Sequence, residues 1–121
     1  MSQSFNSRGF RSALGTFATG VTVITTITPK GEMIGNTASS FNSVSLDPPL
    51  VLWSLARNAL SFDIYRNAKY FAVNVLREGQ DELSARFSKS AGDKWHGIDY
   101  EFWDTGCPIL PSALAIFECR S

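Results

Sequence analysis

The sequence has no long apolar run, no block of like charge and few histidines or cysteines. No stretch reaches the roughly 18 apolar residues of a membrane-spanning helix, and residues 1–10 (MSQSFNSRGF) contain no apolar signal-peptide core. We therefore expect a cytoplasmic protein that does not enter a membrane. Eleven basic and eleven acidic residues are interspersed, which argues against a nucleic-acid partner bound through its phosphates.

The motifs of several enzyme classes are also missing. The sequence contains no G-x-S-x-G, no G-x-x-x-x-G-K-[ST] and no G-x-G-x-x-G. His96 is the single histidine and lies in a polar stretch, so we interpret it as a surface loop residue. Cys107 and Cys119 have no metal-ligand spacing, and we expect two reduced thiols and no metal site. Chemistry is therefore expected to come from a bound cofactor.

What remains is an aromatic-rich chain of 121 residues, a length that predicts a single domain over residues 1–121. β-Branched or alternating segments predict strands, with a bulge or bend near 39–41 and a pairing break at Pro48 and Pro49. The predicted strands are 21–28, 33–45, 50–55, 70–76 and 113–119, with a short strand or irregular segment at 99–103. The predicted helices are 6–20, 61–68 and 79–88.

Strands outnumber helices, and residues 29–32 (PKGE) predict a hairpin turn. This pattern favours an α+β, mainly β protein built as an antiparallel barrel with short peripheral helices. The sequence stops as the last predicted strand finishes, whereas a barrel needs its final strands to close. We therefore expect a domain that is incomplete at its C-terminus.

One stretch, residues 35–53, is rich in hydroxyls and amides and holds Asp47 as its one charged residue. Neutral donors along a strand suit the carbonyl and nitrogen edge of a flavin ring. The alternative is that these side chains satisfy turns and a bulge. The polar side chains are Asn36, Thr37, Ser39, Ser40, Asn42, Ser43 and Ser45.

Two further groups could hold a phosphate. Arg57 and Ser61 flank the start of the helix predicted at 61–68, and helix N-termini attract anions. Ser88, Lys89 and Ser90 follow the next predicted helix and add a cation and two hydroxyls. The alternative for both groups is an ordinary solvated surface.

Taken together, the chain resembles the flavin reductase-like family, the FMN-binding split barrels that serve as reductase components of two-component flavin-dependent monooxygenases. The resemblance rests on the combination of ATGVTV, SFNSVSLDPPLV and FAVNVL in this order, and it covers nearly the whole chain. The matching segments are 10–26, 35–55, 61–76, 80–88, 93–100 and 106–119.

The resemblance implies an antiparallel split barrel that transfers a hydride from NADH or NADPH to bound FMN or FAD. It also implies a homodimer that passes reduced flavin to a partner monooxygenase. The family pattern continues beyond residue 119 into a Gly-Asp-His motif associated with nicotinamide placement, which His96 does not replace. A flavin-binding module without turnover is therefore the alternative function.

The resemblance also implies cofactor-binding residues and no catalytic side chain. It assigns ring contacts to Thr37, Ala38, Ser39, Ser40 and Phe41. It places near the ribityl chain and phosphate Leu55, Ala56, Arg57 and Ser61. At the end of the helix predicted at 79–88, it adds as cofactor-binding residues Phe87, Ser88 and Lys89. Family members commonly carry an amide where Ser39 stands, and we expect this change to alter flavin affinity.

Overall fold

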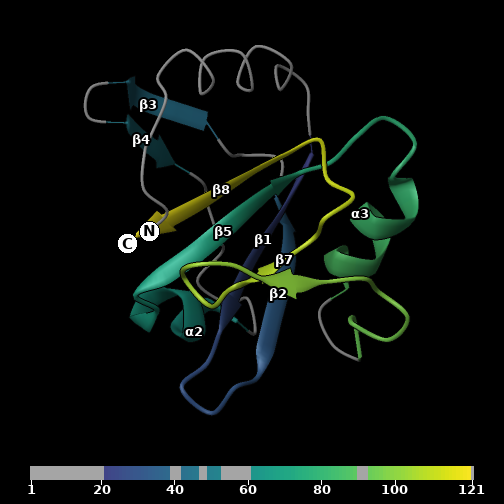
Figure 1. The fold of residues 1–121 in the computed structure, drawn as a ribbon, viewed down its shortest axis with the longest axis horizontal. Coiled ribbons are helices and arrows are strands. Elements are labelled where there is room, and N and C mark those ends of the chain that lie inside the picture. The colour runs from purple at the N-terminus through teal and green to yellow at the C-terminus, as the bar shows by residue number, and fades with distance from the viewer. Residues whose placement is uncertain (1–20, 39–41, 47–48, 53–60, 90–92, 121) are drawn as a thin grey trace.

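The computed structural model describes residues 21–38, 42–46, 49–52, 61–89 and 93–120 (Figure 1). The strands are β1 (Thr22–Ile27), β2 (Met33–Ala38), β3 (Asn42–Leu46), β4 (Pro49–Leu52), β5 (Tyr70–Val75), β6 (Glu101–Phe102), β7 (Pro108–Ile109) and β8 (Ala115–Arg120). The helices are α2 (Phe62–Asn67) and α3 (Asp81–Ser88). The helix predicted at 6–20 lies outside the described residues.

The central element is a four-stranded sheet in the order β2-β1-β5-β8, with every neighbouring pair antiparallel. β1 is β-branched at every position, which disfavours a helix and suits the pleated surface of a strand. Its turn into β2 contains Gly31 at φ 86°, a left-handed conformation that glycine adopts without strain. The predicted antiparallel architecture and the hairpin at 29–32 are therefore confirmed.

The strand predicted at 33–45 is instead two strands. β2 belongs to the four-stranded sheet, whereas β3 pairs with β4 in a separate two-stranded sheet. The predicted bend at 39–41 lies outside the described residues, and the register of β3 and β4 shifts between Ser43 and Ser45. The predicted pairing break at Pro49 is wrong, because Pro49 begins β4 and pairs with Leu46. Proline is compatible with the first position of a strand, where its missing N–H need not donate.

The predicted short helices at 61–68 and 79–88 are confirmed as α2 and α3, and the strands at 70–76 and 113–119 as β5 and β8. β6 lies in the segment where a short strand or irregular structure was expected. It pairs with β7, which the sequence analysis did not predict. Strands of two residues are too short to show an alternating pattern. No helix in the described ranges is long and apolar enough to cross a membrane.

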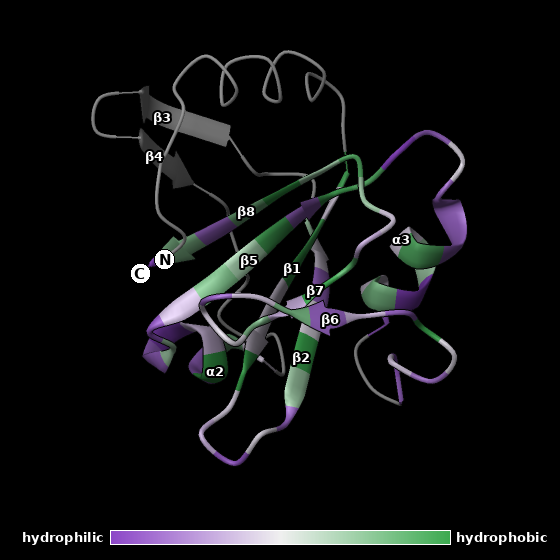
Figure 2. Ribbon diagram, viewed as in Figure 1, coloured by the Kyte–Doolittle hydropathy of each residue, from purple (hydrophilic) through white to green (hydrophobic). Residues whose placement is uncertain are grey.

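The four-stranded sheet is covered on both faces. One face packs Ile24, Val73 and Val75 against Tyr65 of α2. The other packs Val23 against Phe87 of α3. Figure 2 shows hydrophobic residues along β1, β5 and β8, interrupted by more polar positions. Both sides of β5 are covered, so the side chains on both of its faces are buried or half-buried. Neither set of alternating side chains faces solvent.

A buried polar side chain ties the β6–β7 hairpin to the central sheet. Asn74 of β5 is fully buried and donates from Nδ2 to the Val23 carbonyl at 3.0 Å. Its Oδ1 accepts the Leu110 N–H at 2.9 Å, directly after β7. The amide gives the buried Leu110 N–H an acceptor and adds a side-chain donor to the Val23 carbonyl, which lies in the β1–β5 ladder.

Candidate functional site

The candidate site is built around the end of β2, where the two sides of the strand face different helices. Ala38 lies in the core cluster that contains Tyr65 of α2. Gly35 and Thr37, on the opposite side, face α3, because side chains alternate along a strand. The Thr37 hydroxyl donates to the Ser84 carbonyl of α3 at 2.7 Å. The predicted residues of this strand are therefore divided between two faces.

Ser61 meets β2 on the α2 side. It is 8% exposed, and its hydroxyl donates to Asn36 Oδ1 at 2.9 Å. It occupies the N-cap position of α2, but its side chain makes no capping hydrogen bond. The Asn36–Ser61 bond fixes the start of α2 beside β2. Because the hydroxyl proton of Ser61 is donated to Asn36, a phosphate contact from Ser61 would use its main-chain N–H.

The end of α3 lies against the other side of β2. Phe87 is fully buried, and its ring occupies the space where a Cβ on residue 35 would stand. Its ring therefore supports β2 and presents no surface to a ligand. Ser88 is exposed and donates to the Ser84 carbonyl at 2.7 Å, and the exposed Lys89 follows as the C-cap.

The outer edge of β2 is the side of the strand that does not pair with β1. The Thr28 N–H bonds the Glu32 carbonyl at 2.9 Å, and antiparallel pairs alternate from there between bonded and non-bonded. The main-chain groups of Met33, Gly35 and Thr37 are consequently directed outward. Among the described residues, none bonds the outward-facing Thr37 N–H.

The segment that follows α3 covers part of this edge. Trp95 Nε1 donates to the Met33 carbonyl at 3.1 Å, and Lys94 Nζ donates to the Gly35 carbonyl at 3.1 Å. Side chains thus replace a neighbouring strand at two of the outward positions, which protects the edge from pairing with another chain. Thr37 is the next outward position.

Four rings form a row from the core to the surface beside this edge. Phe87 contacts Trp95 at 4.9 Å between centroids, Trp95 contacts Tyr100 at 5.7 Å, and Tyr100 contacts Phe102 at 5.7 Å. All three contacts are edge-to-face, a preferred arrangement of aromatic quadrupoles. Tyr100 and Phe102 are exposed. The row anchors the segment that lies against β2.

The structure therefore brings Thr37, Ala38, Ser61, Ser88 and Lys89 to the neighbourhood of β2 and the two helices that flank it. Six predicted residues lie outside the described residues and stay predictions: Ser39, Ser40, Phe41, Leu55, Ala56 and Arg57. Lys94, Trp95 and the Asn36–Ser61 bond were not anticipated as site features. Segment 93–100 resembled the family, but no role followed from its residue types.

The donor set at the end of β2 is compatible with a flavin edge. It offers an outward-facing main-chain N–H and ammonium groups at Lys89 and Lys94, whereas the hydroxyls of Thr37 and Ser88 both donate to the Ser84 carbonyl. Neutral donors suit the ring edge, and cations suit the phosphate or a negatively charged ring. The Thr37 proton is donated to the protein, so its hydroxyl can offer a ligand only its oxygen.

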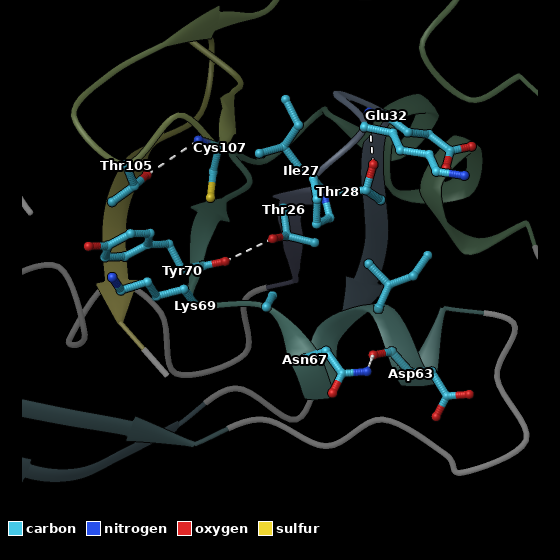
Figure 3. Close-up of a pocket in the computed structure, with 14 residues that line it drawn as sticks. Thr26, Ile27, Thr28, Glu32, Asp63, Asn67, Lys69, Tyr70, Thr105 and Cys107 are labelled. Atoms are coloured by element: carbon cyan, nitrogen blue, oxygen red, sulfur yellow. Dashed lines mark hydrogen bonds between the residues drawn. The ribbon is translucent and has the colours of Figure 1, made fainter.

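A separate pocket lies at the other end of β2 (Figure 3). Its volume is about 600 Å³, and its walls come from the end of β1, the turn into β2, α2, the start of β5, Thr105 and Cys107. It contains none of the predicted cofactor-binding residues. Glu32 at this pocket and Thr37 are five residues apart along the strand, or about 17 Å at 3.3 Å per residue.

Both cysteines are free thiols, as expected. Burial raises the pKa of Cys119 to about 12, with a further contribution from Cys107, and burial also raises the pKa of Cys107. Low thiolate content makes both poor nucleophiles. In the described part of the chain, no three His, Cys, Asp or Glu side chains are grouped as metal ligands would be. His96 is exposed, as predicted.

The fold is that of solved flavin reductases. A structure of the NADH:FAD oxidoreductase SgcE6 of Streptomyces globisporus, in complex with NAD and FAD fragments, superposes with a TM-score of 0.78 at 32% identity. The superposition covers 98% of this chain and 73% of that one. The chain belongs to the flavin reductase-like domain family, which it matches over residues 14–121. The resemblance inferred from the sequence is therefore confirmed.

Two relatives illustrate the similarity. The chain is 53% identical over 115 residues to the FMN reductase (NADH) SmoA of Agrobacterium fabrum, covering 95% of this chain and 65% of that protein. It is 41% identical over 119 residues to HsaB, the reductase subunit of a flavin-dependent monooxygenase of Mycobacterium tuberculosis. That match covers 98% of this chain and 63% of HsaB. The chain thus spans less than two thirds of the length of either relative.

Proposed function

We propose that this protein is an NAD(P)H:flavin oxidoreductase that supplies reduced FMN or FAD to a partner monooxygenase. The observation that carries the proposal is its 53% identity, over almost the whole chain, to a protein named FMN reductase (NADH). The similarity to a reductase subunit of a flavin-dependent monooxygenase supports the partner class. We further propose that the protein acts in the cytoplasm as a homodimer.

The protein's own contribution is binding, orientation and electrostatics. Flavin supplies the hydride-accepting chemistry when bound. The outward N–H of Thr37 can hydrogen-bond the ring edge, and it needs no reorganisation because β1 and α3 fix the strand. Lys89 at the end of α3 can hold the phosphate, whereas the Ser88 hydroxyl donates to the Ser84 carbonyl. Arg57 and Ser61 are proposed to hold it from the α2 side.

The test is to mix the purified chain with FMN and NADH and follow the absorbance of NADH. We expect NADH consumption that requires both protein and added flavin, and reduced flavin that accumulates when oxygen is excluded. Repeating the assay with FAD and with NADPH determines the preferred pair.

Flavin binding without NADH consumption would identify a flavin-binding module and contradict the reductase proposal. Binding is measured separately, by the change in flavin fluorescence on titration with protein. A cooperative thermal transition, monitored by circular dichroism, serves as the folding control. It ensures that an unfolded sample is not mistaken for a folded protein without reductase activity.

A further inference from the structure

Lys94 lies against the outer edge of β2, two residues along the strand from Thr37. Its Nζ donates to the Gly35 carbonyl at 3.1 Å, and its side chain is partly buried. The main-chain groups of Gly35 and Thr37 both point outward on this edge, and the two residues are about 7 Å apart along the strand. The Lys94 ammonium is therefore held beside the main-chain groups proposed to meet the flavin.

The position of Lys94 is fixed from α3. Arg86 donates from Nη1 to the His96 carbonyl at 2.6 Å and to the Lys94 carbonyl at 3.4 Å. Trp95 is held between the Met33 carbonyl and the ring of Phe87. These contacts on both sides of Lys94 limit the positions that its ammonium group can reach.

The charge of Lys94 is not neutralised within the described part of the chain, where no residue forms an ion pair with it. The neighbouring carboxylate of Asp93 instead accepts the Trp95 N–H at 3.1 Å. Partial burial desolvates the Lys94 ammonium and lowers the pKa of Lys94. A partly desolvated cation is costly unless it is paired, and an ammonium with one hydrogen bond to Gly35 has two donors left.

We propose that Lys94 is an anion-binding residue of the flavin site. The proposal depends on the function proposed above. The flavin offers two anionic groups, its phosphate and the ring edge that becomes negatively charged on reduction. Both would bind the free ammonium donors through charge-assisted hydrogen bonds, which are stronger than bonds between neutral groups.

The experiment measures the dissociation constants of oxidised FMN and oxidised riboflavin, and of both after reduction with dithionite under anaerobic conditions. Lys94→Gln removes the charge but keeps a donor for the Gly35 carbonyl, and Lys94→Arg keeps both. We expect Lys94→Gln to weaken binding of at least one anionic form about tenfold or more, and Lys94→Arg to restore most of it.

The two anionic groups give different results. A loss for oxidised FMN but not for oxidised riboflavin assigns Lys94 to the phosphate. Weaker binding of reduced riboflavin, with unchanged binding of oxidised riboflavin, assigns Lys94 to the ring edge. Lys30→Gln, in the exposed turn between β1 and β2, removes the same charge at the other end of the strand and should change no affinity more than twofold.

Equal affinities of the wild type and Lys94→Gln for all four ligands would overturn the Lys94 proposal and leave the reductase proposal intact. A wild type that binds no flavin would overturn both. A purely structural role predicts equal weakening of neutral oxidised riboflavin and of the anionic forms, with a lower melting temperature of the ligand-free protein. That pattern also contradicts the proposal.

Discussion

The ring of Phe87 fills the space beside the Cα of Gly35. A Cβ built on residue 35 would lie 2.7 Å from Cδ1 and Cε1 of that ring and 3.1 Å from the ring of Trp95. Glycine is therefore required at this position by close packing, because α3 and the segment after it both rest on β2 there.

Gly35→Ala should lower the free energy of unfolding by about 1–3 kcal/mol, because the added methyl overpacks a fully buried ring. Denaturant titration measures the change. Phe87→Leu in the same chain should recover part of the loss, since a smaller side chain leaves room for the methyl. Equal costs with and without Phe87→Leu would contradict this packing relationship.

Thr37→Val should lower the free energy of unfolding by about 0.5–1.5 kcal/mol, since the side-chain bond to the Ser84 carbonyl is lost. It should also weaken FMN binding, because the hydroxyl oxygen is removed from the end of β2. Thr37→Ser keeps the hydroxyl and is the matched control. An FMN dissociation constant unchanged in Thr37→Val would remove the Thr37 side chain from the site.

Arg57→Ala is expected to weaken FMN binding by about 1–3 kcal/mol through loss of a charge-assisted bond to phosphate. Riboflavin, which has no phosphate, should bind the variant and the wild type equally. Fluorescence titrations with the two ligands measure both quantities. An unchanged FMN affinity would refute the assignment of Arg57 to the phosphate.

Asn74→Leu should destabilise the protein by about 2–4 kcal/mol. The change leaves the buried Leu110 N–H and the Val23 carbonyl without their side-chain partner. Asn67→Leu is the control, because Asn67 is exposed and its one bond, to the Asp63 carbonyl, is also exposed. That variant should stay within about 0.5 kcal/mol of the wild type in chemical unfolding.

Cys119 should make stability fall as the pH rises above 9. The unfolded thiol loses its proton near pH 9, whereas the folded thiol, with a pKa of about 12, keeps it. The unfolded state therefore binds fewer protons in this window, and the contribution of Cys119 decreases by about 1.4 kcal/mol per pH unit until the folded thiol also titrates. The contribution is fully present below pH 9.

Cys119→Ala should show a shallower decline between pH 9 and 10.5, measured by denaturant titration under reducing conditions. Burial also raises the pKa values of Tyr65 and Cys107, so these two groups also lower stability as the pH rises. Both are present in the variant and in the wild type, so the comparison isolates Cys119. Identical slopes for the variant and the wild type would contradict a raised pKa of the Cys119 thiol in the folded protein.

Much of the fold follows from local patterns in the sequence. The β-branched run at 21–28 and the turn at 29–32 are sufficient to predict the first hairpin, and Leu83 with Phe87 marks the buried side of α3. The failures concern pairing partners that residue types do not specify. Pro49 pairs with Leu46 although proline usually interrupts a strand, and β7 exists through its pairing with β6 and through the Leu110–Asn74 bond, which joins residues 36 positions apart.

The candidate site shows the same division. Thr37 and Ser61 are recognisable from residue type and position, but the partners of their hydroxyls are Ser84 and Asn36, 47 and 25 residues away. Lys94 resembles any loop lysine in the sequence. Its importance comes from the carbonyl it meets on β2, which depends on the register of the sheet.

The row of rings from Phe87 to Phe102 gives the protein a built-in optical reporter. The indole of Trp95 is hydrogen-bonded to the strand that borders the candidate site, and indole emission overlaps the absorption of flavins. With Trp53 and Trp103 replaced by phenylalanine, quenching of the remaining fluorescence would follow ligand arrival and departure in real time. Stopped-flow kinetics could then show whether cofactor release limits each cycle.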